Sequence, residues 1–467
     1  MEAGSPKSPG PEGSKASGKS PKKAIPYQSA NRSWLAAQGK LPLCFMGLAL
    51  AWLVAATALV VSHPGILKLS HVSPHVIALA HAWLLGFFVT VATGAVYQIV
   101  PVALSTKLWN EPLGWAHFVL HALGVPGMVF LFWSYQLKFV GIFGCFVALG
   151  IILFTLNTWM TIKTSPRNDI VAISIFLAAG WLALGVLAGL FLIANRLWGW
   201  VPVDPIALLR THAHLGLIGF FLTLLQGVGF QLLPMFTMGQ VTRWRPPTIG
   251  IWCSQAGLCL LIPALIWQIQ LLGVIAGIVI VVGLISSGIG IKFALETRKK
   301  KHLDPGIQVF LFGGVGVVLA ALTGLLLMIL GPGQGAFAGG FGPMTYAILG
   351  IFGGLLPCIA GMMCKIVPFL TWMRSYGPLV GRFRTPPAHS LTHPRLERIG
   401  LGLQQLSTIP FLIGAWKLNL LWLQVGAGLL VFGVILFMID MLLILKHLWR
   451  KAKMEPLGFK IPTQQTT

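Results

Sequence analysis

Two histidines lie close together inside a stretch that is apolar enough to cross a membrane. His212 and His214 begin a run that ends at Pro234, and most of the residues between are hydrophobic or glycine. Imidazole is costly in hydrocarbon unless it is paired or bound, so histidines in such a segment indicate a binding site by default. Neutral imidazole binds iron and other transition metals well, and burial keeps it neutral. The pair therefore predicts a site for a metal or a metal-containing cofactor.

The spacing of the two histidines limits what they can bind. Residues two apart on a helix point about 200° away from each other and differ by about 3 Å in height. His212 and His214 therefore do not readily share one small ion, but each can face a different neighbouring helix. One of them can complete a six-coordinate haem with a partner across the helix interface, while the other holds a second haem or a metal. The competing interpretation is hydrogen bonding within a packed bundle.

The composition indicates the class of protein that holds these residues. Of 467 residues, 56% are hydrophobic and 9% are charged, and the mean hydropathy is +0.83. These values are typical of a polytopic membrane protein. The net charge of +23 comes from Lys and Arg in tails and short loops, so we expect no nucleic-acid partner. The six cysteines form no C-x-x-C and no C-x-x-C-H, which excludes covalent haem attachment through such a motif.

We expect an all-α integral membrane protein with twelve transmembrane helices, because twelve apolar segments are long enough to span a bilayer. A tail rich in Ser, Pro, Gly and Lys at residues 1–35 is predicted to be disordered. The membrane domain covers 36–450, and residues 451–467 form a second tail. The expected spans are 41–62, 75–104, 114–135, 139–162, 169–195, 206–236, 249–268, 271–294, 307–330, 343–371, 399–416 and 418–447.

The basic residues of the loops predict the orientation. Most of them, including Lys107, Arg167 and the run 298–301, fall on one side of the expected spans, together with both tails. By the positive-inside rule that side is the cytoplasm. The expected location is therefore the inner (plasma) membrane, with both termini cytoplasmic and His212 and His214 toward the outer face.

An internal repeat connects the second, sixth and tenth expected spans. The segment from His81 to Pro101 matches the segment from His214 to Pro234 at a constant offset of 133 residues, and the tenth span follows at an offset of 134. The chain is thus predicted to contain three pseudo-repeats of four helices, at about 41–162, 169–294 and 307–447. At the histidine positions the three repeats read Leu79-Ala-His81, His212-Ala-His214 and Tyr346-Ala-Ile348.

These segments resemble a known family. The run from His212 to Pro234 is similar to the tenth helix of the catalytic subunit (subunit I) of haem-copper oxidases and the related nitric oxide reductases, where an H-x-H pair binds two haems. The run from His81 to Pro101 resembles the second helix of that family, whose histidine is the other axial ligand of the low-spin haem. The resemblance covers most of residues 40–450.

The resemblance implies a function and a set of ligands. It implies b-type haem held by His81 and His214, His212 as the ligand of a second haem, and copper as a further cofactor. The expected function is electron transfer or reduction of oxygen or nitric oxide. The implied partners are membrane lipid, cytochrome c or quinol as electron donor, and other oxidase-type subunits.

The chain also departs from the family pattern. Its H-x-H lies in the second repeat, and it contains no His-His pair, so the copper site is degenerate and oxidoreductase activity stays an open prediction. If the H-x-H repeat is aligned on the third repeat of the family, His81, His117 and His121 fall where copper ligands belong. His117 and His121 share a helix face, but they begin a span from the side opposite to His81. The alternative function is a transporter or a non-redox membrane scaffold with structural histidines.

Overall fold

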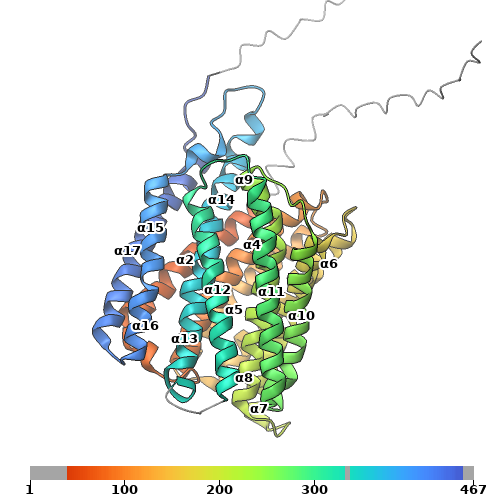
Figure 1. Ribbon diagram of the computed structural model, residues 1–467. Helices are drawn as coiled ribbons and strands as arrows, with labels where there is room; N and C mark the ends of the chain where they lie inside the picture. Colours follow the sequence, from red (N-terminus) through yellow and green to blue (C-terminus); the bar gives the residue numbers. More distant parts are fainter. Residues whose placement is uncertain (1–38, 332–336, 456–467) are drawn as a thin grey trace, which may run out of the picture.

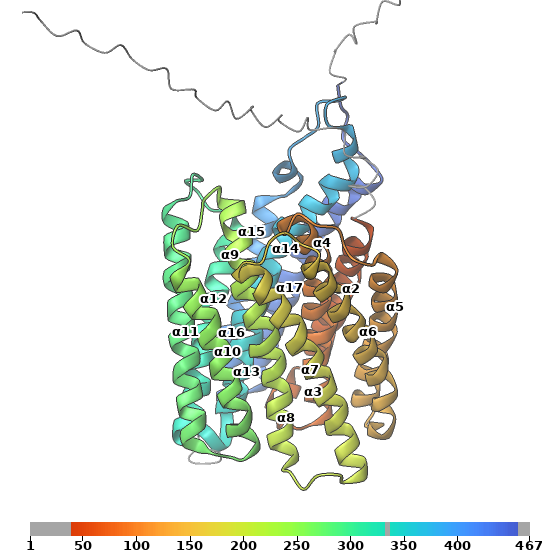
Figure 2. The ribbon, with the colours of Figure 1, turned by 90° about the vertical axis from the view of Figure 1, so that its right-hand side faces the viewer.

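The computed structural model describes residues 39–331 and 337–455, and these fold into a bundle of long helices that stand side by side (Figures 1 and 2). The tail predicted at 1–35 and the end of the second tail lie outside the described residues. The helices are α2 (Lys40–Ser62), α3 (Pro74–His81), α4 (Thr90–Ala103), α5 (Glu111–Trp133), α6 (Leu137–Lys163), α7 (Ile170–Trp198), α8 (Pro205–His214), α9 (Thr223–Thr237), α10 (Arg245–Ile266), α11 (Gln270–Glu296), α12 (Pro305–Leu330), α13 (Gly342–Ile348), α14 (Leu356–Ser375), α15 (Pro394–Leu406), α16 (Thr408–Trp416) and α17 (Leu420–Leu445).

Eleven helical segments in the described residues are long and apolar enough to cross a membrane, and the protein is an integral membrane protein. The count of twelve is not reached because the segment expected at 399–416 divides into α15 and α16, which meet at Ser407. Pro410 explains the break, because proline has no N–H to donate to the carbonyl four residues earlier. Both short helices pack against α17.

Three of the spans form the centre of the bundle. They are 74–103, 205–237 and 342–375, and 67%, 67% and 78% of their most apolar windows are buried, against 50% or less for every other span. These are the second, sixth and tenth expected spans, which carry the repeat. The repeat-equivalent residues therefore lie where the units of the bundle meet.

Each central span contains a π-helical segment at the same place in the repeat. These segments are η2 (Ala82–Val89), η3 (Leu215–Leu222) and η5 (Leu349–Leu355), and they begin directly after His81, His214 and Ile348. A π-helical turn donates to a carbonyl five residues back and is often found at functional sites. Thr90 and Thr223 follow this pattern with their side chains, because their hydroxyls donate to Leu85 O (3.0 Å) and Ile218 O (3.2 Å).

The glycines of the repeat serve close helix packing. A Cβ atom added to Gly86 would lie 2.5 Å from the Trp52 ring, and one added to Gly227 would lie 2.3 Å from Ser174 Cβ. Both neighbours belong to the first helix of the same four-helix unit. Small residues at these positions let the helix backbones approach closely.

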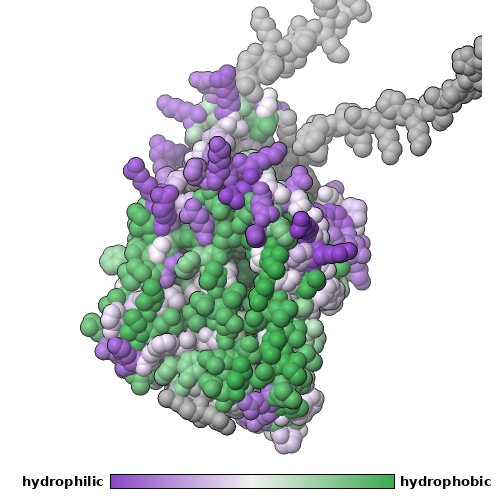
Figure 3. Space-filling model, in the orientation of Figure 1, coloured by the Kyte–Doolittle hydropathy of each residue, from purple (hydrophilic) through white to green (hydrophobic). Residues whose placement is uncertain are grey.

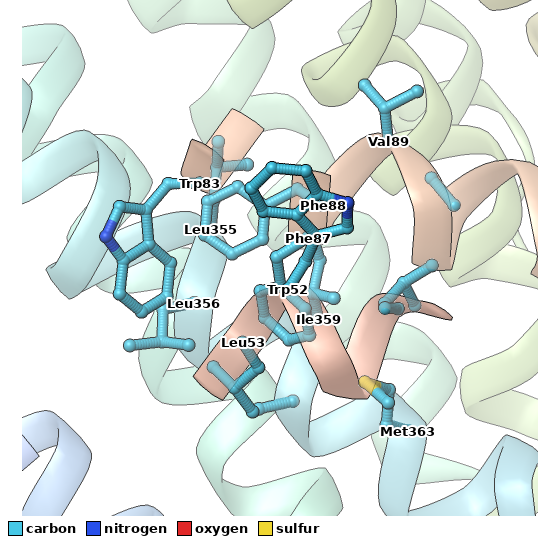
Figure 4. Packing of buried hydrophobic residues seen from close by; sticks show 14 of the residues in the cluster. Trp52, Leu53, Trp83, Phe87, Phe88, Val89, Leu355, Leu356, Ile359 and Met363 are labelled. Carbon is cyan, nitrogen blue, oxygen red and sulfur yellow. The ribbon is translucent and has the colours of Figure 1, made fainter. Parts of the chain in front are cut away.

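Apolar residues cover the middle of the bundle and also fill its core. On the face seen in Figure 3, apolar residues cover the middle of the bundle, and polar residues gather at the end from which 376–395 project. Inside the bundle, Figure 4 shows aromatic and aliphatic side chains of α2, η2, η5 and α14 packed together. Trp83 meets Phe352 edge-on with ring centres 5.3 Å apart. This contact joins the first and third central spans without a polar group between the two rings.

Candidate functional site

A cavity of about 190 Å³ lies between α3, α5, α6, α7 and α8. Two of its lining residues are His81 and His212, which lie on different central spans, and most of the others are apolar. The lining residues are Val72, Pro74, Ile77, His81, Leu85, Met128, Phe132, Leu137, Val140, Gly141, Gly144, Val147, Val186, Gly189, Leu190, Leu192, Ile193, Arg196, Leu209 and His212. An apolar cavity with a few converging polar groups is the usual form of a cofactor site.

The two histidines are oriented by hydrogen bonds from one side of each ring. His81 Nδ1 donates to Ile77 O at 2.7 Å, and His212 Nδ1 donates to Gly185 O at 2.8 Å. An Nδ1–H that donates to a carbonyl leaves Nε2 as the nitrogen with a free lone pair. Neither Nε2 has a hydrogen-bond partner among the described residues. The rings are nearly parallel, at 18°, with centres 6.2 Å apart.

Three glycines lie among the residues that line the cavity. Gly189 of α7 lies beside the His212 ring, and a Cβ atom there would come within 2.9 Å of His212 Cε1. Gly141 and Gly144 of α6 also line the cavity. On the opposite side the Phe132 ring stacks on His81, with centres 5.2 Å apart and an angle of 23°. Gly189 thus packs against the His212 ring, and Phe132 packs against the His81 ring.

One end of the cavity carries a basic side chain. Arg196, in the last turn of α7, lines the cavity. Nearby, His71 lies in the loop before α3, where burial and then the charge of Arg210 lower the pKa of its imidazole. His71 is therefore neutral at pH 7, and the arginines supply the charge. Such an entrance favours a cofactor that carries carboxylate groups.

His214 faces a different neighbour from His212. Its Nδ1 donates to Arg210 O at 2.7 Å, and the Tyr346 hydroxyl donates to its Nε2 at 3.2 Å. The two rings lie at 20° with centres 5.8 Å apart. We expected His81 to pair with His214, but the structure brings His81 beside His212 and His214 beside Tyr346. Each residue of the H-x-H pair does face a different helix, as the helical geometry predicts.

His117 and His121 are fully buried and lie closer to the cavity than the sequence suggests. His121 Nε2 is 3.2 Å from Leu85 O, one turn from His81, so half a membrane does not separate them. His117 Nδ1 is 3.1 Å from the Tyr97 hydroxyl. No group of three His, Cys, Asp or Glu residues suited to a metal ion occurs in the described ranges. The pair thus lacks the three-ligand set common in copper and zinc centres.

A lysine on the third central span forms an ion pair, and the other two central spans have glutamine at the equivalent position of the repeat. Lys365 is the repeat equivalent of Gln98 and Gln231, and its Nζ lies 2.8 Å from Asp304 Oδ2. Burial raises the pKa of the Asp304 carboxyl, but hydrogen bonds from Lys300 and Lys365 outweigh this and lower it below the usual value. Asp304 is therefore ionised at pH 7, and the ion pair ties α14 to the start of α12.

Some cavity residues have no signal in the sequence. Arg196 and Gly189 belong to α7, outside the repeat motif, and nothing in their spacing connects them with His81. Arg196 was visible only as a basic residue near an expected outer loop. Phe132 is one of 28 phenylalanines. Only the packing of α7 and α5 around the central spans brings these three residues to the histidines.

Comparison with known proteins gives one result at the level of fold. No protein-family model matches the chain, and no curated protein matches it in sequence. Among solved structures, a haem-copper terminal oxidase dimer determined by cryo-electron microscopy is similar, with a TM-score of 0.58 and 11% sequence identity. The match covers 89% of this chain and 84% of that chain. This chain is therefore an integral membrane protein whose fold is similar to that of a chain of a haem-copper terminal oxidase.

Proposed function

We propose that the protein is a membrane redox protein that binds b-type haem in the cavity between α3, α5, α6, α7 and α8, where His81 and His212 would hold the cofactor. The observation that carries the proposal is the pair of near-parallel imidazoles at this cavity. Each has its Nδ1 engaged by a backbone carbonyl and its Nε2 free. In metal-binding histidines, the nitrogen that does not bind the metal commonly donates in this way.

The separation of the two rings fits a shared ion. With metal–nitrogen bonds of about 2 Å, two imidazoles that would hold one ion have ring centres no more than roughly 6 Å apart. The observed separation is 6.2 Å. Arg196 lines the same cavity and is suited to a carboxylate group of the cofactor. The donor set of two imidazoles and one guanidinium therefore fits haem.

The chain contributes binding, orientation and exclusion of water. His81 and His212 hold the cofactor from two central spans, and the backbone bonds at Ile77 and Gly185 fix both rings. Phe132 and the aliphatic lining keep water away. When bound, haem supplies a one-electron couple whose potential depends on its axial ligands and apolar surroundings.

The resemblance in fold guides the wider proposal. We infer that the protein transfers electrons or takes part in reduction of oxygen or nitric oxide, with a quinol or a cytochrome c as electron donor and oxidase-type subunits as partners. We further infer an inner (plasma) membrane location with both tails in the cytoplasm. The basic residues at the projecting end of the bundle support this orientation.

Haem analysis of the purified protein tests the proposal. We expect about one b-type haem per chain by the pyridine haemochrome assay, with reduced-minus-oxidised bands after dithionite. His81→Ala and His212→Ala should each abolish these bands, while the detergent-solubilised variants remain monodisperse. A folded parent protein that carries no haem after expression with haem supplementation would contradict the proposal and favour a transporter or scaffold.

A further inference from the structure

Each central span receives a polar contact from a neighbouring helix within its π-helical segment. The contact is made at backbone carbonyls that occupy equivalent positions of the repeat, those of Leu85, Ile218 and Phe352. The neighbour is the third helix of the same unit, because α5 contacts η2, α10 contacts η3 and α15 contacts η5. The side chains that make the contact lie about three turns after the start of their helices, and they are His121, Gln255 and Gln405.

In the first unit the contact comes from an imidazole. His121 Nε2 lies 2.9 Å from Thr90 Oγ1 and 3.2 Å from Leu85 O. A carbonyl oxygen only accepts, so Nε2 carries a proton and donates to both oxygens. Thr90 donates in turn to the same carbonyl, at 3.0 Å. The fully buried imidazole thus ties α5 to the backbone of η2 through these hydrogen bonds.

In the second unit a side-chain amide takes this place. Gln255 Nε2 donates to Thr223 Oγ1 at 2.7 Å, and Thr223 donates to Ile218 O at 3.2 Å. Gln255 Oε1 accepts from Trp181 Nε1 of α7 at 2.6 Å, which orients the amide. The threonine is the repeat equivalent of Thr90, so the hydroxyl is kept while the donor above it changes from imidazole to amide.

In the third unit the amide reaches the carbonyl directly. Pro357 stands at the position of the two threonines. Proline has neither an N–H nor a hydroxyl, so it cannot donate to a carbonyl of the preceding turn. Gln405 Nε2 donates to Phe352 O instead, at 3.3 Å. Three different arrangements of side chains therefore serve the same backbone carbonyl.

A π-helical segment sets the direction of the side chains that precede it. A π-turn holds one residue more than an α-turn, so its conversion to α-helix would rotate one half of the span against the other by about 100°. The halves after the π-helical segments are fixed by tight packing. A Cβ atom would lie 2.5 Å from Phe45 Cβ at Gly94, and 2.3 Å from Ser174 Cβ at Gly227. The conversion would therefore turn the halves that carry the histidines.

We propose that His121 and Gln255 are positioning residues of the haem site, because they hold η2 and η3 in the π-helical form in which His81 and His212 line one cavity. His81 directly precedes η2, and His212 precedes η3. The proposal rests on the proposed function, since these two histidines would hold the cofactor. Gln405 acts in the same way on η5, which follows Tyr346 and so does not serve the cavity.

Haem titration of the full-length protein in detergent tests this role. His121→Leu and Gln255→Leu remove the donor and keep an apolar side chain. Both should bind haemin at least about tenfold more weakly than the parent, because groups that orient a metal-binding histidine contribute that much to affinity. Gln405→Leu is the matched control and should titrate as the parent does. His121→Gln introduces the residue of the other two units and should restore the affinity and the reduced bands of the parent.

Amide hydrogen exchange provides a readout that does not depend on haem. In the haem-free protein, the amides of 82–90 should exchange faster in His121→Leu than in the parent, because η2 has lost its contact with α5. Those of 215–223 should do so in Gln255→Leu and those of 349–356 in Gln405→Leu. Each variant should leave the other two segments unchanged, whereas a general loss of stability would accelerate all three.

The outcomes that overturn the proposal are distinguishable. Parent-like haemin affinity in folded His121→Leu and Gln255→Leu, or an equal loss in Gln405→Leu, would refute the positioning role alone. Unchanged exchange of 82–90 in His121→Leu would show that the imidazole does not hold η2. A parent protein without haem would refute the proposed function and the positioning of its ligands with it. If His121→Leu does not fold, His121→Asn, whose side chain is too short to reach Leu85 O, replaces it with the same expected loss.

Discussion

His81 and His212 face each other across a cavity, whereas His214 and Tyr346, at the corresponding positions one unit further along the chain, are joined by a hydrogen bond. The ring geometries are nearly the same, at 6.2 Å and 18° for the first pair and 5.8 Å and 20° for the second. A single difference in side chain separates them. The tyrosine hydroxyl reaches the Nε2 atom of its histidine, while a second imidazole leaves that atom free.

The third pair of corresponding positions completes the comparison. Leu79 and Ile348 are both buried and apolar, and one turn further along, Trp83 meets Phe352 through their rings. The same positions of the repeat therefore carry two imidazoles in the first pair, an imidazole and a phenol in the second, and two aliphatic side chains in the third. The comparison teaches that the fold provides the positions, and that the side chains decide whether a position binds a cofactor.

Removal of each histidine of the H-x-H pair should give the largest contrast. His212→Ala should lose essentially all haem, because it removes one of the two imidazoles that would hold the cofactor and its hydrogen bond to Gly185 O. His214→Ala should retain haem, since its Nε2 is already engaged by Tyr346. Pyridine haemochrome content per chain measures both. Equal loss in the two variants would show that the two pairs do not differ as described.

Replacement of Tyr346 should make the second pair similar to the first. Tyr346→His removes the hydroxyl that engages His214 and places two imidazoles at the corresponding positions. We expect haem per chain to rise up to about twofold, because bis-histidine pairs bind haem iron well. Tyr346→Phe, which removes the hydroxyl without adding a ligand, is the control and should leave haem content at the parent value. No gain in Tyr346→His would indicate that other walls of the second interface also exclude the cofactor.

The sequence was sufficient for much of the fold. Apolar length located eleven spans that match long helices, and the repeat identified the three spans that prove to be central. The break at Ser407 was missed because α15 and α16 together have the length and hydropathy of one span, although Pro410 was visible. The π-helical segments have no recognised sequence signal, so their place after His81, His214 and Ile348 came only from the structure.

The site was predicted in its residues but not in its pairing. Helical geometry showed that His212 and His214 face different neighbours, yet it does not tell which neighbour each one meets. That depends on the order in which the central spans surround the axis of the bundle. We expected His81 to pair with His214, which occupy equivalent positions in the repeat. In the structure, His212 lies beside His81 of the first central span, and Tyr346 lies beside His214 of the second.

Substitution of a glycine on α7 should lower haem binding by His81 and His212 less than removal of either histidine does. In Gly189→Ala the new methyl group would lie 2.9 Å from His212 Cε1 and must push the ring. We expect haem content to fall by roughly threefold and the reduced bands to shift, because a displacement costing about 0.7 kcal/mol lowers affinity by that factor. Gly324→Ala, whose methyl group would lie 3.2 Å from the Tyr346 ring, is the matched control. A loss of haem in the control alone would reverse the assignment of the two pairs.

The smallest effect on haem is expected at the interface between the first and third central spans, where Trp83 and Phe352 make only packing contacts. Phe352 is buried and meets both Trp83 and Phe411, with ring centres 5.3 Å and 5.0 Å apart. Phe352→Ala should lower stability by about 3–5 kcal/mol, as large-to-small changes in a packed core do. Thermal unfolding followed by tryptophan fluorescence measures this loss, while haem per folded chain should stay at the parent value. Because the first pair is bounded by α5, α6 and α7, a loss of haem from the folded Phe352→Ala protein would mean that the interfaces are coupled through the central spans, and the three pairs would then act as one site.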